Sequence, residues 1–178
     1  MPVASIPVAS ILLTTFQPWK AHQISNSSDD LVAQLQFEGR LPPNSVWLRH
    51  VPVSFDLAPV QVIEKMRYHR PKVVVCCGMA EKRPYLSLEQ QASWQQQTLT
   101  TDLDLSRLLE GTLLSKISYD AGQYVCNRLY YAVLEATQQY NCLQNWATQV
   151  IFVHVPILSS ANQRLVVDDF SKILMRLA

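Results

Sequence analysis

Glycine is scarce in this sequence, which has 4 glycines among 178 residues. Loops that cradle phosphate groups need glycines at short spacing, because backbone N–H groups must approach the ligand closely. No such loop can be found, which disfavours a phosphate-using enzyme on an α/β scaffold, such as a nucleoside phosphorylase.

Charge is also low, at 16% charged residues and a net charge of +1. Nucleic-acid-binding proteins carry a basic patch or stripe, and none is present, so no nucleic-acid partner is expected. The hydrophobic fraction of 48% is enough for a sizeable core. We therefore predict one ordered domain over residues 1–178.

The 4 cysteines contain no C-x-x-C spacing. Cys76 and Cys77 lie in the apolar run 73–77, which is typical of a buried strand, and adjacent strand residues point to opposite faces. They cannot jointly hold a metal or easily form a disulfide. We expect no metal, no cofactor and no disulfide framework, and a cytoplasmic location.

Long hydrophobic runs are missing too: no stretch approaches the roughly 20 apolar residues that a membrane span needs. The first 16 residues are uncharged, but no Lys or Arg precedes the apolar stretch, and Pro2 and Pro7 interrupt it. This pattern argues against a signal peptide and a membrane partner. The motif Pro-Val-Ala-Ser-Ile occurs at 2–6 and again at 7–11, and we assign it no function.

Apolar strand patterns alternate with helical patterns along the chain. Strands are expected at 11–15, 46–53, 73–77, 113–118 and 150–155. Helices are expected after the capping residues 26–30, over 57–70, at 103–109, from 120–122 onward and at 165–177. The helix over 57–70 has an apolar face formed by Leu57, Val60, Ile63 and Met66. The helix from 120–122 onward has Val125, Leu129, Val133 and Ala136 on one face. Residues 84–101 are expected to form a loop or short irregular strands. The pattern predicts an α/β fold of three layers, α/β/α, with a mostly parallel central sheet.

In open α/β sheets, functional sites gather beyond the carboxyl ends of the strands. Four segments qualify: the turn 16–19, the loop after Gly78, the segment 119–126 and the segment 154–156. The candidate chemistry therefore comes from the residues of these segments.

Cys126 falls near the start of a helix, where unpaired N–H groups and the helix dipole favour a thiolate. The alternative is a small buried hydrophobic residue. His154 ends an apolar strand, and a histidine near a thiol can hold it as an ion pair and protonate a leaving amine. Its alternative is a core histidine bonded to the backbone.

Glu89 follows Leu86 and Leu88, which alternate with Ser87 as in a short strand. Its carboxylate could accept an imidazole N–H and fix the tautomer of the ring; the alternative is a solvated carboxylate. The remaining histidines, His22, His50 and His69, are interpreted as solvated residues of loops or helix surfaces.

These residues lie in blocks that resemble the pyroglutamyl peptidase I (pyrrolidone carboxyl peptidase) family. The blocks are GMAEKR at 78–83 with EQQA at 89–92, SYDAGQYVCN at 118–127, FVHVP at 152–156 and LLTTFQPW at 12–19. Asn26 and Ser28 stand where that family has an asparagine and a serine. The likeness spans about residues 11–158, with a gap in the middle.

The resemblance implies a cysteine exopeptidase that removes an N-terminal pyroglutamyl residue, or a related small acyl group, from peptides. Cys126 would be the nucleophile, His154 the acid–base residue and Glu89 its orienting carboxylate. Backbone N–H groups, including that of Cys126, would hold the oxyanion. The substrate-binding residues implied are Phe16, Trp19, Asn26 and Met79; ordinary core packing is the alternative for the two aromatic residues. A small peptide would be the partner, and assembly with further copies of the chain is left open.

The sequence also departs from that family. Thr15, Lys20 and Ala21 stand where the family has glycines, Met79 replaces a glutamine that contributes to ligand recognition, and Gln90 replaces an arginine. Only residues 95–113 span a longer family segment that helps cover the site. A divergent, shortened member is therefore expected, with an opening to more water. A degenerate homologue that binds peptide N-termini without cleaving them is the alternative function.

Overall fold

The computed structural model describes residues 9–178, so the first copy of the Pro-Val-Ala-Ser-Ile repeat and the start of the second lie outside the described residues. The elements in chain order are β1 (Ile11–Phe16), α1 (Ser27–Phe37), β2 (Ser45–Val51), α2 (Leu57–His69), β3 (Val73–Met79), β4 (Leu86–Glu89), β5 (Gln91–Trp94), β6 (Gln97–Thr100), α3 (Leu105–Leu108), β7 (Ser115–Ser118), α4 (Val125–Gln144), β8 (Gln149–Val155) and α5 (Gln163–Leu177).

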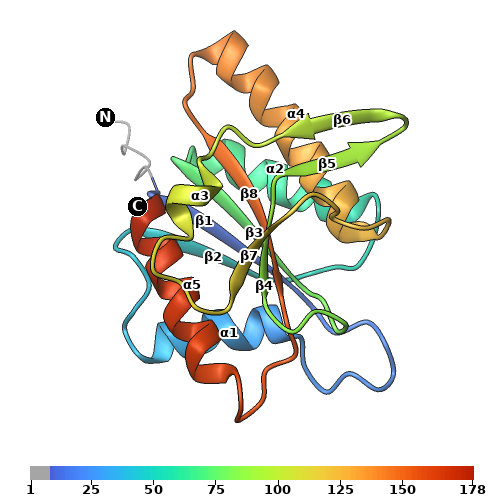
Figure 1. Cartoon of the computed structure of the whole chain (residues 1–178). Helices are drawn as coiled ribbons and strands as arrows, with labels where there is room; N and C mark the ends of the chain where they lie inside the picture. The colour runs from blue at the N-terminus through green and yellow to red at the C-terminus, as the bar shows by residue number, and fades with distance from the viewer. Residues whose placement is uncertain (1–8) are drawn as a thin grey trace, which may run out of the picture.

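The central sheet has six strands in the order β2-β1-β3-β8-β4-β7. All neighbours are parallel except β4 and β8, which run antiparallel. Helices α1, α3 and α5 cover one face, and α2 and α4 cover the other (Figure 1). The predicted three-layer α/β fold with a mostly parallel sheet is confirmed, whereas its treatment as one domain stays a prediction.

Burial on both faces explains the continuous apolar runs of β1, β3 and β8. Cys76 packs into the core on the α2 and α4 side, and its neighbour Cys77 packs into the core on the other side. The prediction that the two thiols point to opposite faces is confirmed.

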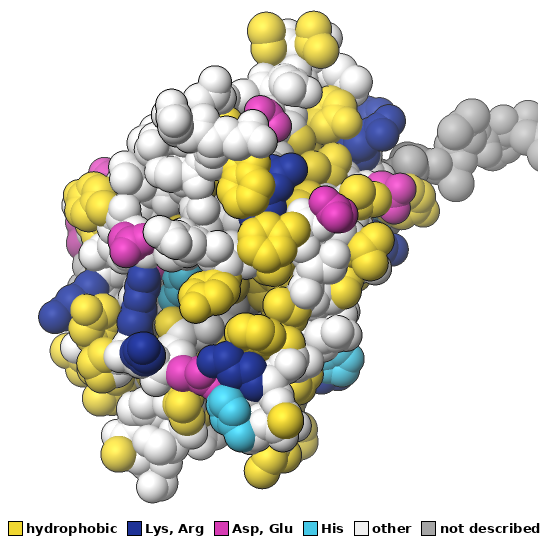
Figure 2. Space-filling view, turned by 90° about the vertical axis from the view of Figure 1, so that its right-hand side faces the viewer, with side chains coloured by type: hydrophobic (Ala, Val, Ile, Leu, Met, Phe, Trp, Pro, Cys, Tyr) yellow, Lys and Arg dark blue, Asp and Glu magenta, His cyan; other side chains and the backbone are white. Residues whose placement is uncertain are grey.

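The loops that follow β1 and β3 project together on the right-hand side of Figure 1. Figure 2 turns this side to the viewer and shows hydrophobic side chains beside a small group of basic, acidic and histidine side chains. The carboxyl ends of the parallel strands thus meet at one surface, as the parallel arrangement requires.

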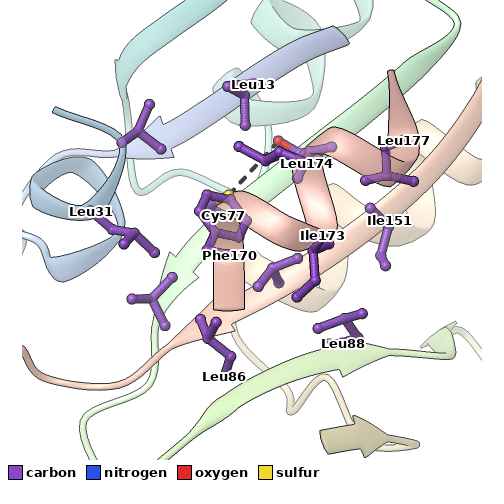
Figure 3. Packing of buried hydrophobic residues seen from close by; sticks show 14 of the residues in the cluster. Leu13, Leu31, Cys77, Leu86, Leu88, Ile151, Phe170, Ile173, Leu174 and Leu177 are labelled. Atoms are coloured by element: carbon purple, nitrogen blue, oxygen red, sulfur yellow. Dashed lines mark hydrogen bonds between the residues drawn. The ribbon is translucent and has the colours of Figure 1, made fainter. Parts of the chain in front are cut away.

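The core beneath α5 illustrates how the layers are held together (Figure 3). Phe170 and Leu174 of α5 pack with Leu13, Cys77 and Ile151 from three adjacent strands, and all five are fully buried. Each large aliphatic or aromatic side chain buried in this way contributes about 1.5–3 kcal/mol relative to exposure. This packing fixes the strands whose ends carry the site.

Helix α2 presents a face to the core that agrees only in part with the expected one: Met66 and Ile63 contact the core as expected, but Leu57 and Val60 do not. Leu57 is 58% exposed and Val60 53% exposed, whereas Ala58, Val62 and Met66 are fully buried. The buried residues recur every four positions, and the small Ala58 allows a close approach to the sheet. The sequence pattern alone could not distinguish the two faces of the helix, because apolar residues occur on both.

The glutamine-rich segment is more regular than the expected loop or irregular strands. Leu86 and Leu88 of β4 are fully buried, and β5 and β6 form an antiparallel hairpin that packs on α4. Gln95 and Gln96 turn the hairpin with φ of 47° and 64°. A two-residue turn of this kind normally uses Asn or Gly, so the usual sequence signal was missing.

Two boundaries also differ. Gly78 does not end β3 but lies within it and pairs with His154 of β8. Helix α4 begins at Val125 rather than at 120–122, because Gly122 has a φ of 79° and Tyr124 is extended as the N-cap residue. From residue 9 onward, none of the helices has the length and apolar character needed to cross a membrane.

Candidate active site

His154 and Glu89 form a buried hydrogen-bonded pair. Strand β4 runs antiparallel to β8, with Glu89 opposite Phe152 and Ser87 opposite His154, so Glu89 and His154 are diagonal neighbours. Such neighbours are within reach of long side chains on the same face. Nδ1 of His154 lies 2.7 Å from Oε1 of Glu89.

This contact fixes the state of the imidazole ring. A carboxylate only accepts hydrogen bonds, so Nδ1 must carry the proton that His154 donates to Glu89. In the neutral ring, Nε2 is then free to accept a proton. Glu89 is fully buried and His154 is 6% exposed, so water competes little for the contact.

Cys126 is the second residue of α4 and reaches the sheet above Gly78. A Cβ atom added to Gly78 would lie 2.8 Å from the sulfur of Cys126 and 2.9 Å from Cζ of Phe152. Gly78 is the residue paired with His154 across β3 and β8. The absence of a side chain at Gly78 therefore lets the start of α4 place its thiol next to the His154 strand.

Cys126 and His154 line the same cavity, which has a volume of about 490 Å³. Glu89 does not line it and lies behind His154. Within the described part of the chain, no hydrogen bond links the sulfur to the His154 ring. The structure thus brings two of the three candidate catalytic residues to one cavity and attaches the third to the histidine.

The pKa of Cys126 is raised to about 12, mainly because burial disfavours the thiolate. The backbone N–H of Cys126 and the charge of Arg83 lower this pKa, but less than burial raises it. The expectation of a thiol with a lowered pKa is therefore wrong for this structure. The stabilisation at the helix start is real but smaller than the desolvation cost, so Cys126 rests as a neutral thiol.

All four residues expected to bind substrate, Phe16, Trp19, Asn26 and Met79, line the cavity. Phe16 is 3% exposed and also belongs to the core. Trp19 is 54% exposed, and its ring centroid lies 6.4 Å from that of Tyr124 at the start of α4. Aromatic side chains therefore form part of the cavity lining.

The comparisons with known proteins agree with this arrangement. No family model matches the chain. A pyrrolidone-carboxylate peptidase of Gloeobacter violaceus is 27% identical in an alignment 176 positions long, which covers 83% of this chain and 82% of the relative. A pyrrolidone-carboxylate peptidase of Bacillus cereus strain Q1 is 23% identical, with coverage of 84% and 79%. The chain is thus similar to pyrrolidone-carboxylate peptidases over more than four fifths of its length.

Solved structures show the same fold. Pyroglutamyl peptidase I of Bacillus amyloliquefaciens superposes with a TM-score of 0.74 at 20% identity, over 92% of this chain and 94% of that one. A mutant pyrrolidone carboxyl peptidase of Pyrococcus furiosus gives 0.73 at 18% identity, over 94% and 97%. The three-layer architecture is thus that of pyroglutamyl peptidase I structures.

Lys20, one of the departures from the pyroglutamyl peptidase I pattern, joins the turn after β1 to the loop after β3. Glu81 accepts hydrogen bonds from Lys20 at 2.5 Å and from Gln23 at 2.9 Å, and His22 lies 2.9 Å from it. Gln23 in turn accepts from the backbone N–H of Trp19 at 3.0 Å. We call Lys20, His22, Gln23 and Glu81 the clasp, and it anchors the Trp19 wall.

The clasp also explains the acidity of its carboxylate. Hydrogen bonds from Gln23, Lys20 and His22, in decreasing order, lower the pKa of Glu81 to about 2. Glu81 is therefore ionised across the whole neutral range.

Asn26 has a structural task besides lining the cavity. Its Oδ1 caps α1 by accepting from the backbone N–H of Ser28 at 3.1 Å and from the Ser28 hydroxyl at 2.7 Å. Its Nδ2 has only a long contact of 3.4 Å to the carbonyl of Gln17. The amide N–H groups are the part of Asn26 that remains available to a ligand.

The segment 95–113 contributes no side chain to the cavity. Its strand β6 packs on α4, and its helix α3 packs against α5. The cavity is lined from residues 16–26, 53–55, 79–83, 121–126 and 154. The expected opening to more water stays a prediction.

Sequence reasoning missed several residues of the site. Phe55 follows β2 and lines the cavity, and the rule about strand ends could have identified it. The close approach at Gly78 had no sequence signal beyond the glycine itself. His50 lies on β2 rather than in a loop or on a helix, and contacts Asp29 at 3.2 Å.

Proposed function

We propose that this chain is a cysteine exopeptidase that removes an N-terminal pyroglutamyl residue, or a related small acyl group, from peptides. The observation that carries the proposal is the buried His154–Glu89 pair on the cavity that also holds the Cys126 thiol. The relatives named pyrrolidone-carboxylate peptidase support the choice of substrate.

The first step is attack of the thiol on the acyl carbonyl. Because Cys126 rests in its neutral form, the proton must leave as the sulfur–carbon bond forms, and Nε2 of His154 accepts it. Glu89 holds the opposite ring nitrogen and stabilises the imidazolium that results. This is general-base catalysis rather than attack by a preformed ion pair.

The negative oxygen that develops needs hydrogen-bond donors nearby. The N-cap residue Tyr124 makes no side-chain hydrogen bond to α4, so it leaves the N–H groups of the first turn available to a ligand. These donors, including that of Cys126, form the proposed oxyanion hole, where one donor contributes about 3 kcal/mol.

Collapse of the intermediate breaks the carbon–nitrogen bond, and His154 gives its proton to the departing amine of the shortened peptide. A water molecule, deprotonated by the same histidine, then attacks the thioester carbonyl. The acyl group leaves as free pyroglutamate and the Cys126 thiol is restored, so protons balance over the cycle.

The cavity suits a small, mostly apolar acyl group. Its volume of about 490 Å³ lies within the range of small-molecule sites, which is roughly 300–1,000 Å³. Phe16 and Trp19 would contact the faces of the lactam ring, and the Asn26 amide would donate to it. Met79 offers no strong donor or acceptor, which favours tolerance of related acyl groups.

A small peptide is thus the proposed partner. A cytoplasmic location follows only from the pattern of free cysteines and stays a prediction. Assembly into a homo-oligomer is likewise left open by the sequence.

The test is turnover of pyroglutamyl 4-nitroanilide by the wild-type chain and by Cys126→Ser. We expect wild type to release nitroaniline and the variant to lose at least about 10³-fold in kcat, as nucleophile removal does in triad enzymes. Prolyl 4-nitroanilide, which lacks the lactam carbonyl, serves as the matched control substrate. Tight binding of a pyroglutamyl peptide without product would instead support the degenerate homologue.

A further inference from the structure

Arg83 connects the two halves of the proposed catalytic apparatus. Its Nη1 lies 2.5 Å from Oε1 of Glu89, and its Nη2 donates to the backbone carbonyl of Asp120 at 2.6 Å. Nη1 also makes a long contact of 3.4 Å to the hydroxyl of Ser118. One guanidinium therefore touches the strand that carries Glu89 and the segment that leads into α4.

The carboxylate of Glu89 depends on this contact. Its side chain is fully buried, Oε1 accepts from both Arg83 and His154, and Oε2 has no hydrogen-bond partner among the residues described. A buried carboxylate is costly unless a positive charge or hydrogen bonds compensate it. Arg83 is the permanently charged partner that compensates Glu89.

Loss of that charge would affect the histidine indirectly. A buried carboxylate without a cation favours its neutral form or a rotation toward other donors. In either case the Nδ1–H of His154 would lose its charged acceptor, and the ring would no longer be held with Nε2 free. The second bond, to Asp120, ties the approach to Cys126 to the same guanidinium.

We infer that Arg83 is a positioning residue that holds Glu89 against His154. The inference rests on the proposed function for its kinetic consequence, while its structural consequence can be measured without turnover. The planar guanidinium presents its donors in a rigid fork that suits these two acceptors, whereas a lysine ammonium is a compact charge on a flexible stem.

The kinetic test compares Arg83→Gln, Arg83→Lys and the control Lys116→Gln with wild type on pyroglutamyl 4-nitroanilide. Lys116 is a cation on the neighbouring strand β7 that faces the ring of Tyr85 and does not line the cavity. We expect kcat to fall about 100-fold in Arg83→Gln, in line with misplacement of a catalytic group. Arg83→Lys should be intermediate, and Lys116→Gln should match wild type.

A double-mutant cycle separates positioning from a general structural role. If Arg83 acts through Glu89, adding Arg83→Gln to Glu89→Gln should change kcat by less than about threefold, because the shared function is already lost. A further 100-fold loss in the Glu89→Gln background would overturn the inference. So would an Arg83→Gln variant with the kcat of Lys116→Gln.

A spectroscopic measurement tests, independently of activity, whether Arg83 holds Glu89 against His154. The proton on Nδ1 of His154, shared with a buried carboxylate, should give a far-downfield ¹H NMR signal, assigned by its loss in His154→Gln. We expect the signal to persist in Lys116→Gln and to disappear in Arg83→Gln. If Arg83→Gln does not fold, Arg83→Lys replaces it, and the signal should shift in that variant. An unchanged signal would refute positioning by Arg83, whereas absence of turnover in wild type would refute only the peptidase.

Discussion

Gly78 lies directly beneath the sulfur of Cys126, and a methyl group there would stand 2.8 Å from that sulfur. The same methyl group would stand 2.9 Å from Cζ of Phe152. Since Gly78 is paired with His154, a side chain at this position would push the thiol away from the strand that carries the imidazole.

Gly78→Ala should therefore reduce kcat about 100-fold, because either the thiol or the Phe152 ring must move. Overpacking of this kind also costs about 1–3 kcal/mol of stability. Kinetics with pyroglutamyl 4-nitroanilide and urea denaturation measure the two effects. Gly39→Ala is the control: φ is +65° there, so alanine is strained, but nothing lies within 4 Å. Comparable activity loss in both variants would show that instability alone is responsible.

The fold was predictable because its signals are local and redundant. The buried runs of β1, β3 and β8 are apolar on both faces, and the face of Val125, Leu129 and Val133 on α4 is buried as expected. The β5–β6 hairpin was not predictable in this way, because glutamines occupy its turn and its stability comes from packing on α4.

The site was predictable only in part. The spacing of motifs could mark Cys126, His154 and Glu89, but their contacts depend on strand order, and β4 reaches His154 because it joins the sheet antiparallel. The pKa of Cys126 is raised because the folded chain buries the thiol, and this effect outweighs the stabilisation at the helix start that the sequence indicated. The bonds of Arg83 likewise arise only in the folded chain.

Alkylation of Cys126 should depend steeply on pH. With a thiol pKa of about 12, the thiolate fraction rises about tenfold for each pH unit between pH 7 and 9. Iodoacetamide labelling at fixed pH values, read by peptide mass spectrometry, checks the slope. The buried Cys76 and Cys77 should remain unlabelled in the folded protein, and the exposed Cys142 provides an internal reference. A rate for Cys126 that is independent of pH from 6 to 9 would indicate a preformed thiolate–imidazolium pair.

Asn26 can be divided into its capping and binding parts by substitution. Asn26→Ser keeps an oxygen that caps α1, so stability should stay near wild type, while Asn26→Ala should lose about 1 kcal/mol. Both variants lack the amide N–H groups, and both should raise KM for pyroglutamyl 4-nitroanilide by about tenfold. If KM rises only in Asn26→Ala, Asn26 acts through the helix cap alone.

Removal of the clasp should weaken substrate binding more than chemistry. Glu81→Gln breaks the ion pair with Lys20, so the turn that carries Trp19 loses its anchor; we expect KM to rise severalfold and kcat to stay within about twofold. Steady-state kinetics measure KM and kcat separately, and Glu110→Gln is the control because Glu110 does not line the cavity. A fall in kcat with unchanged KM would contradict the assignment.

The clasp also has a defined pH window. The pKa of Glu81 is lowered in the fold, so its stabilising contribution is complete above its ordinary value of 4.5 and is lost as pH falls toward 2. The difference in stability between wild type and Glu81→Gln should therefore be constant above about pH 5 and shrink below pH 4. A stability difference that grows on acidification would show that the pKa of Glu81 is raised, not lowered, in the fold.

Trapping of the acyl-enzyme shows whether Cys126 is the nucleophile. Wild-type protein mixed with pyroglutamyl 4-nitroanilide and quenched in acid within milliseconds should carry one pyroglutamyl group on the Cys126 peptide, detected by mass spectrometry. Hydroxylamine, which cleaves thioesters, should remove this adduct from the wild-type protein. Cys126→Ser should carry no hydroxylamine-sensitive adduct, and Glu89→Gln should accumulate less of it. Release of nitroaniline by Cys126→Ala at the wild-type rate, or an adduct on a different residue, would show that Cys126 is not the nucleophile.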